Sequence, residues 1–583
     1  MPRPDHQPTS ESERLAAWGP ELLSNGRARF RLWAPDKRAM ILELDGAAPV
    51  TMERSADGWF SAVADAEPGA RYRFRLDDEL VVPDPASRAQ SGGVHGWSVL
   101  IDLTAYRWRS AEWRGRPWEE TVIEEVHAGV LGGFPGLAER LPEMAERGVT
   151  AIEIMPVAAF AGSRNWGYDG VLPYAVAESY GSPEDFKTLI DRAHDLGLMV
   201  FLDVVYNHFG PDGNYLGAYA SDFFDADADT PWGGAVAVSR EPVRRFFIDN
   251  AMMWLDEYRI DGLRFDAVHA IADNAFLDEM AKEVRAAFPD RYIHLVLENE
   301  HNDAERLAPD LYDAQWNDDF HNVLHVLLTG EDEGYYAGFA DNPTAKLARC
   351  LAEGFIYQGE TPPGSDHARG TPSGGLSTTR FVSFLQNHDQ TGNRAMGERL
   401  TVLTDSDRLR AATALLLLMP QIPLLFMGDY EGSHSPFLFF TDFHDDLADA
   451  VREGRRGEFA SFSAFADPEA RERIPDPNAQ STFNTSRPEP GPDAERWRRL
   501  YRELLTLRHT QIVPRLASAQ GLGVEVLGKG AVTARWRMAD SAVLSIAINL
   551  GEDGVCFPDV EGETLFELQR AGAPASFRAT LAA

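Results

Sequence analysis

The chain has 583 residues and a formal net charge of −36, and it is 44% hydrophobic and 25% charged. This length predicts more than one domain, and the composition is typical of a soluble protein with large cores. The acidic charge excludes nucleic acid as a natural partner and fits a neutral substrate. The longest apolar run, residues 411–419, is too short to cross a membrane, and the N-terminal residues hold no apolar core of the secretory kind. We therefore expect a cytoplasmic protein that does not bind membranes.

The first part of the chain predicts a small β domain behind a tail. Residues 1–14 are polar and rich in proline, which indicates a flexible tail. In residues 15–110, short segments such as RARFRLWAP and ARYRFRLDD alternate apolar with polar residues, and turns rich in Gly, Pro and Asp separate them. Short alternating strands with frequent turns predict an immunoglobulin-like β-sandwich resembling a carbohydrate-binding module.

From residue 111 to residue 515, apolar runs alternate with longer amphipathic segments. Eight runs read as strands, and the sixth is the weakest: residues 121–129, 150–157, 198–206, 260–268, 292–300, 311–318, 379–389 and 422–429. Among the connecting helices, the clearest covers residues 182–197, with Ser182 as N-cap, Pro183 at the first helical position and Asp185 in the first turn. Eight strands with intervening helices predict a (β/α)8 or TIM barrel with long loop insertions, and thus an α/β fold.

The C-terminal part returns to short strands. Residues 467–493 are rich in Pro, Asp and Asn and predict an extended excursion on the surface. A closing helix is expected over residues 496–509. Residues 516–583 contain VEVLGKG, AVTARWRM and AVLSIAINL, which predict a second β-sandwich domain.

Acidic residues gather where the predicted barrel strands end. Asp203 ends the third strand, Asp266 the fourth, Glu298 the fifth and Asp389 the seventh. The C-terminal ends of barrel strands line one mouth of the fold, where active sites lie. Glycoside hydrolysis needs one protonated carboxyl group and one carboxylate, and Asp266, Glu298 and Asp389 supply both with one to spare. Arg264 shares a strand face with Asp266 and would keep it ionised.

Other readings of these residues stay open. A single Asp at a strand end is more often a cap or a salt-bridge partner, and Asp203 fits a structural role at the rim. Glu298 and Glu300 share a face, so spacing does not decide which of them is the acid. Histidines near several acids could hold a metal, but no HxH or HExxH spacing is present, and Cys350 and Cys556 are too far apart in sequence to suggest a zinc site. We expect no metal and no cofactor.

Aromatic residues in the predicted rim loops form a second group of candidates. Trp166, Tyr168 and Asp169 follow the second strand, and Trp232 lies in the long loop after the third strand. Flat rings at a rim suit stacking on pyranose faces. The alternative is that these rings pack the loops onto the barrel.

Four segments resemble the signature regions of the α-amylase superfamily, glycoside hydrolase family 13. They are DVVYNHFG at 203–210, GLRFDAVHA at 262–270, the strand that ends in Glu298, and FLQNHD at 384–389, in the family's order. The resemblance implies a retaining mechanism with Asp266 as nucleophile, Glu298 as acid/base and Asp389 as transition-state stabiliser. It also implies that further residues bind substrate: Arg264, His208, His388, Asn207, Tyr168, Asp169, Trp166, His269 and Trp232.

Within the superfamily, longer segments such as RNWGYDGVLPYAV and IPDPNAQSTFNTS resemble the malto-oligosyltrehalose trehalohydrolases. That family cleaves the α-1,4 bond next to the terminal trehalose of maltooligosyl trehalose and releases trehalose, after a maltooligosyl trehalose synthase has supplied the substrate. Two alternatives remain at this point. One is a 1,4-α-glucan branching enzyme or another glucan hydrolase of the same superfamily, and the other is a non-catalytic protein that binds α-glucan.

Overall fold

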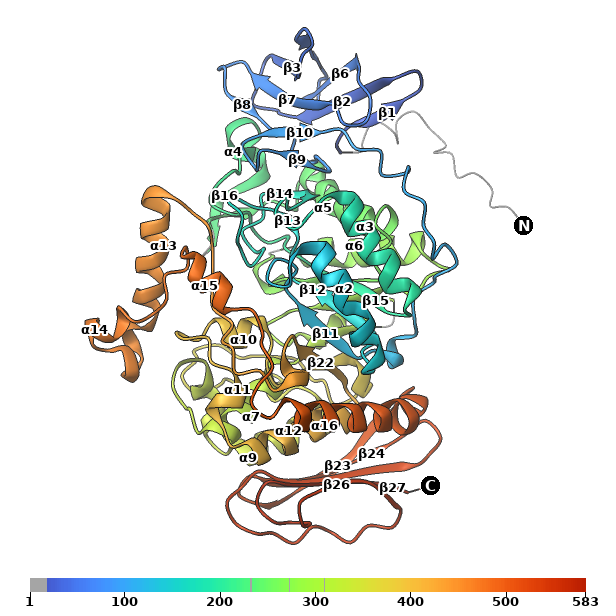
Figure 1. The fold of residues 1–583 in the computed structure, drawn as a ribbon, viewed down its shortest axis with the longest axis vertical. Helices are drawn as coiled ribbons and strands as arrows, with labels where there is room; N and C mark the ends of the chain where they lie inside the picture. Colours follow the sequence, from blue (N-terminus) through green and yellow to red (C-terminus); the bar gives the residue numbers. More distant parts are fainter. Residues whose placement is uncertain (1–17, 231–232, 272, 309, 583) are drawn as a thin grey trace.

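The computed structural model describes residues 18–230, 233–271, 273–308 and 310–582. The expected tail and Trp232 lie outside the described residues. Three layers follow one another along the longest axis: an N-terminal pair of sheets, a barrel, and a C-terminal sheet at the opposite end (Figure 1). Within the described residues, no helix combines the length and apolarity that a membrane crossing requires.

The N-terminal layer consists of two antiparallel sheets, with strand orders β1-β2-β6-β5 and β4-β3-β7-β10-β9, and β8 pairs with β7. Their bounds are β1 Glu21–Leu23, β2 Arg27–Trp33, β3 Met40–Leu44, β4 Val50–Thr51, β5 Glu53–Arg54, β6 Trp59–Asp65, β7 Arg71–Leu76, β8 Val81–Val82, β9 Gln90–Ser91 and β10 Trp97–Val99. Phe30 and Phe60 of the first sheet and Tyr72 and Phe74 of the second are fully buried in one core. Because alternate residues of each strand point into this core, the sandwich prediction is confirmed.

Eight parallel strands close into a barrel in the order β11-β12-β15-β18-β19-β20-β21-β22. Their bounds are β11 Ile123–Val126, β12 Ala151–Ile154, β15 Met199–Val204, β18 Gly262–Phe265, β19 His294–Leu297, β20 Ala314–Trp316, β21 Phe381–Ser383 and β22 Ile422–Phe426. Each lies inside one of the eight expected segments, and the weak sixth segment forms a strand of three residues. The barrel prediction is confirmed.

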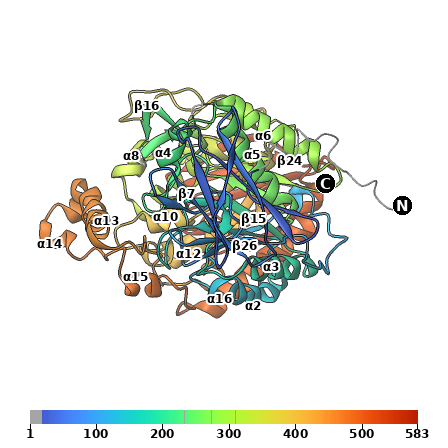
Figure 2. The same ribbon diagram turned by 90° about the horizontal axis from the view of Figure 1, so that it is seen from above.

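Helices surround the barrel, as Figures 1 and 2 show. The longer ones are α2 Gly133–Glu146, α3 Pro183–Asp195, α5 Glu241–Asp256, α6 Asn274–Ala287, α7 Asp318–Thr329, α9 Pro343–Glu353, α12 Ser406–Leu418, α13 Asp445–Glu458 and α16 Ala494–Leu507. Helix α3 begins with the expected capping box, in which the Ser182 hydroxyl accepts from the Asp185 N–H and the Asp185 carboxylate accepts from the Ser182 N–H. Shorter elements of the loops are β13 Ala158–Ala159, β14 Leu172–Val176, α4 Leu216–Tyr219, β16 Phe224–Thr230, β17 Gly233–Val236, α8 Ala337–Ala340, α10 His388–Gly392, α11 Leu400–Leu403, α14 Pro468–Arg471 and α15 Gln480–Thr485.

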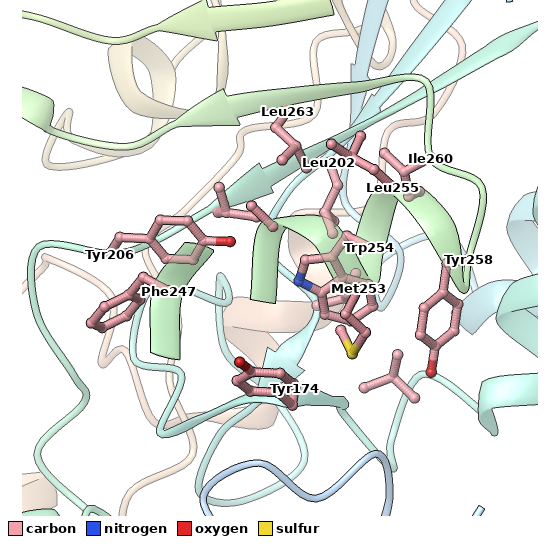
Figure 3. Packing of buried hydrophobic residues seen from close by; sticks show 14 of the residues in the cluster. Tyr174, Leu202, Tyr206, Phe247, Met253, Trp254, Leu255, Tyr258, Ile260 and Leu263 are labelled. Carbon is pink, nitrogen blue, oxygen red and sulfur yellow. The ribbon is translucent and has the colours of Figure 1, made fainter. Parts of the chain in front are cut away.

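Helix α5 packs behind the strands that carry the site. Figure 3 shows Trp254 of α5 beside Leu202 of β15 and Leu263 of β18, with Tyr206 close by. Asn250 of α5 makes three hydrogen bonds in this packing: it accepts from the Tyr206 hydroxyl at 2.7 Å and the Trp254 indole at 3.1 Å, and it donates to the Pro173 carbonyl at 2.9 Å. These bonds tie α5 to β14 and to the residues that directly follow β15.

The C-terminal strands form one five-stranded antiparallel sheet in the order β23-β24-β25-β27-β26. Their bounds are β23 Gln520–Gly528, β24 Ala531–Arg537, β25 Val543–Asn549, β26 Glu563–Leu568 and β27 Ser576–Ala582. A sandwich was expected here, with a second sheet packed on the first. In the part of the chain that the structure describes, helices α9 and α12 of the barrel pack on this sheet instead. Trp536 of β24 donates to the Leu351 carbonyl of α9 at 3.1 Å. The helices bury the apolar face of the sheet, which a second sheet would otherwise cover.

The surface excursion is helical and longer than expected. It contains α13, α14 and α15, and α13 and α14 project from one side of the barrel in both views (Figures 1 and 2). Arg455 of α13 is buried and donates to the carbonyls of Gly392 and Arg394 at 2.7 and 3.0 Å. The excursion therefore touches the end of α10, which follows the seventh barrel strand.

Candidate active site

The barrel interior changes from apolar to acidic along several strands. Ile123, Ala151, Val296 and Trp316 belong to the apolar cluster that fills the barrel. Because side chains alternate along a strand, the residues two positions further on face the same interior. Those residues are Glu125, Glu153, Glu298 and Asp318. Carboxyl groups thus line one end of the barrel, above its apolar floor.

Arg264 is the centre of a buried ion-pair network. Its Nη1 lies 2.9 and 2.8 Å from the two carboxylate oxygens of Asp203, and 2.7 Å from Oδ1 of Asp266. The guanidinium lies over the Trp316 ring at 4.1 Å, and the Tyr168 hydroxyl donates to Asp203 at 2.5 Å. The structure therefore joins four predicted residues in one network: Arg264, Asp203, Asp266 and Tyr168.

Glu298 and Glu300, which spacing could not separate, lie in different environments. The side chain of Glu298 is 18% exposed, lies 3.8 Å from Arg264 and accepts from the Ala267 N–H at 2.5 Å. Ala267 adopts a left-handed backbone with φ of 41°, which turns its N–H toward this carboxyl group. Burial raises the pKa of Glu298 well above its usual range, and nearby Asp266, Asp318 and Asp389 raise it further. The side chain of Glu300 is instead 72% exposed and pairs with His269 at 3.6 Å.

Asp389 lies in the first turn of α10. Asn393 donates to its Oδ1 at 2.5 Å, and Asp389 is exposed to solvent. The preceding His388 packs its ring against Tyr168, with ring centroids 5.0 Å apart, and meets the edge of Trp166 at 5.4 Å. Asp389, His388 and Tyr168 thus share one wall of the acidic mouth.

The remaining predicted residues have different surroundings. Asn207 is buried, and its amide oxygen and nitrogen have no hydrogen-bond partner among the described residues. His208 is buried, and burial lowers its pKa, as it does that of His269. Asp169 accepts from Asn165 at 2.6 Å. Trp166 is buried, stacks on Phe437 and donates to the Leu438 carbonyl at 2.9 Å, so its position fits the packing alternative rather than a sugar platform.

Acidic side chains predominate in this arrangement. No group of three or more His, Cys, Asp or Glu side chains within the described ranges is placed to hold a metal ion. An ion-paired aspartate beside a glutamate of raised pKa can act as nucleophile and proton donor toward an acetal carbon.

Known proteins resemble this chain over most of its length. The malto-oligosyltrehalose trehalohydrolase of Deinococcus radiodurans is 41% identical over 517 residues, which cover 86% of this chain and 84% of that protein. The chain belongs to the malto-oligosyltrehalose trehalohydrolase family. The trehalohydrolase of Saccharolobus solfataricus is also 41% identical, over 79% of this chain and 81% of that protein.

Domain and structure comparisons agree with this trehalohydrolase family. The catalytic domain of the alpha-amylase family matches residues 95–229, and a domain of unknown function, DUF3459, matches residues 519–582. A solved structure from Salmonella typhimurium, provisionally named an alpha amylase, has a TM-score of 0.92 at 44% identity and covers 97% of this chain and 100% of its own. A pullulanase from Anoxybacillus sp. LM18-11 shares the fold at 16% identity, with a TM-score of 0.73 and coverage of 97% of this chain and 88% of its own.

Three interior carboxyl groups of this trehalohydrolase-family chain are missing from the sequence prediction. Glu125 and Glu153 lie within apolar strands rather than at their ends, where the search for acids looked. Asp318 follows the sixth strand, and burial together with the charge of Asp389 raises its pKa to about 7. Extending the alternation of interior residues to every strand would have found all three.

Proposed function

We propose that this protein hydrolyses the α-1,4 bond next to the terminal trehalose of maltooligosyl trehalose, releasing trehalose and a maltooligosaccharide. The carboxylate of Asp266 attacks the anomeric carbon while Glu298 protonates the glycosidic oxygen, so that trehalose leaves and a glycosyl-enzyme forms. Water then attacks the same carbon, gives a proton to Glu298 and frees Asp266. The net reaction retains the α configuration.

The observation that carries this proposal is the contrast between the environments of Asp266 and Glu298 beside Arg264. Asp266 is ion-paired to Arg264 at 2.7 Å, whereas burial and neighbouring carboxylates raise the pKa of Glu298 well above its usual range. Two carboxyl groups in contrasting environments are what acid and nucleophile roles require. The trehalohydrolase names of the relatives, which match most of the chain, support the choice of bond.

We assign the substrate-binding role to residues around these acids: Arg264, His208, His388, Asn207, Tyr168, Asp169 and His269. A maltooligosyl trehalose synthase would supply the substrate, because the terminal α,α-1,1 bond must form before this enzyme acts.

Product analysis tests the proposal. Incubation with maltotriosyl trehalose is expected to yield trehalose and maltotriose in equal amounts, separated by chromatography. Maltopentaose, which has the same number of glucose units but no 1,1-linkage, is the matched control and should react much more slowly. Longer glucans with new branch points, and no trehalose, would instead indicate a branching enzyme, an activity carried by a relative that is 28% identical over only 58% of this chain.

The dependence of kcat/KM on pH should show whether Asp318 raises the pKa of the proposed acid/base Glu298. Asp318 is one of the groups that raise the pKa of Glu298. Asp318→Asn removes that charge, so Glu298 should lose its proton at lower pH, and the alkaline limb of kcat/KM against pH should move to lower pH. Asp332→Asn, at an exposed position after α7, is the control and should leave the limb unchanged. An unmoved limb in Asp318→Asn would remove Asp318 from this role.

A further inference from the structure

Both carboxylate oxygens of Glu125 contact His388. The Oε2 atom accepts the backbone N–H of His388 at 2.7 Å, and Oε1 lies 2.5 Å from Nδ1 of its ring. Glu125 lies on β11, faces the barrel interior and is 1% exposed. A first-strand residue thus holds two separate groups of the residue that precedes Asp389.

These two contacts fix both the orientation of the His388 imidazole and the position of the first residue of α10. With Nδ1 engaged by Glu125, Nε2 is the ring nitrogen left to contact a sugar hydroxyl. The backbone bond anchors the first residue of the helix turn that carries Asp389. The ring also stacks on Tyr168, which bonds to Asp203, so the contact continues to the Arg264 network.

Carboxylates of the barrel interior contact Arg264 and His388 in a similar way. Asp203 of β15 binds Arg264 from the barrel interior, and Glu125 of β11 binds His388. Burial alone would lower the pKa of His388, but Glu125 and Asp389 outweigh it and raise the pKa above its ordinary value. Glu153 is paired with Glu125 in the strand register, and its carboxylate oxygens have no hydrogen-bond partner among the described residues. Burial, with the charge of Glu125, raises the pKa of Glu153 well above its usual range.

We propose that Glu125 is a positioning residue of the catalytic site: it orients the His388 ring toward the substrate and sets the α10 turn that presents Asp389. It acts through His388 and does not touch the substrate. This inference rests on the proposed function. The side-chain oxygen left in Glu125→Gln can still accept the His388 backbone N–H, so the inference predicts that the charge of Glu125 matters for turnover only while the His388 ring is present.

A double-mutant cycle tests this dependence. Glu125→Gln keeps the size of the side chain and removes its charge, and kcat on maltotriosyl trehalose should fall by about 10²-fold, because small misplacements of catalytic groups are costly. In the His388→Asn background, the same change should alter kcat by less than about threefold. Glu125→Asp keeps the carboxylate and should recover part of the loss; it also replaces Glu125→Gln in the cycle if that variant fails to fold.

Glu124→Gln is the matched control on the same strand. Glu124 is also buried, but it pairs with Arg147 rather than with a residue of the site. It should lower the unfolding midpoint and leave kcat near the wild-type value. Equal losses from Glu125→Gln in both backgrounds would make Glu125 a purely structural residue and overturn the inference. A wild-type protein that releases no trehalose would instead defeat the proposed function, so the two failures are distinguishable.

Discussion

Replacing Asp266 with Asn should lower kcat on maltotriosyl trehalose by about three orders of magnitude or more, because no glycosyl-enzyme can form without the nucleophile. The amide keeps the size of the side chain and a hydrogen-bond acceptor for Arg264, so the fold should persist. Steady-state kinetics and circular dichroism measure the two effects separately.

Asp273→Asn is the control for this substitution. It makes the same chemical change in the loop that follows β18, at the N-cap of α6, where Asn caps as well as Asp. It should leave kcat near the wild-type value. An Asp266→Asn enzyme that retains a tenth of its activity would show that another group attacks the anomeric carbon.

Glu298→Gln should have the second large effect, a loss of about three orders of magnitude in kcat on maltotriosyl trehalose, because the departing sugar receives no proton. With α-maltosyl fluoride, whose leaving group needs no proton, the first step should continue and the glycosyl-enzyme should accumulate. Mass spectrometry of the intact protein detects that adduct.

Glu300→Gln is the matched control, because it makes the same change two residues away on an exposed side chain paired with His269. Its kcat should stay within a few-fold of wild type. Comparable losses in Glu300→Gln and Glu298→Gln would contradict the assignment of the acid.

The barrel could be predicted from the sequence because its strands are buried on both sides. Seven of the eight segments are strongly apolar runs, whereas the sixth, which contains the three-residue strand Ala314–Trp316, is weak. The cover of the C-terminal sheet could not be predicted, since it depends on α9 and α12, more than a hundred residues earlier in the chain. Apolar alternation reveals that one face of a sheet is buried, but not what buries it.

Site residues could be predicted from the sequence only where the end of an apolar run marks the end of a strand. Asp266 follows its apolar run directly, and Asp389 follows its run after three polar residues, so their common location at the barrel mouth could be expected. The choice between Glu298 and Glu300 came from the resemblance, and the two side chains differ in burial, contacts and pKa for reasons that lie in the Ala267 backbone and the neighbouring acids. Burial of Trp166 against Phe437 depends on a loop some 270 residues further along, which local sequence does not encode.

Proton NMR during the first minutes of maltotriosyl trehalose hydrolysis tests the central claim most directly, because one spectrum reports both the bond cleaved and the configuration of the product. Retaining release of trehalose predicts the anomeric signal of free trehalose together with the α-anomer of maltotriose, which precedes the β-anomer formed later by mutarotation. Initial appearance of the β-anomer, or maltooligosaccharide products without trehalose, would contradict it.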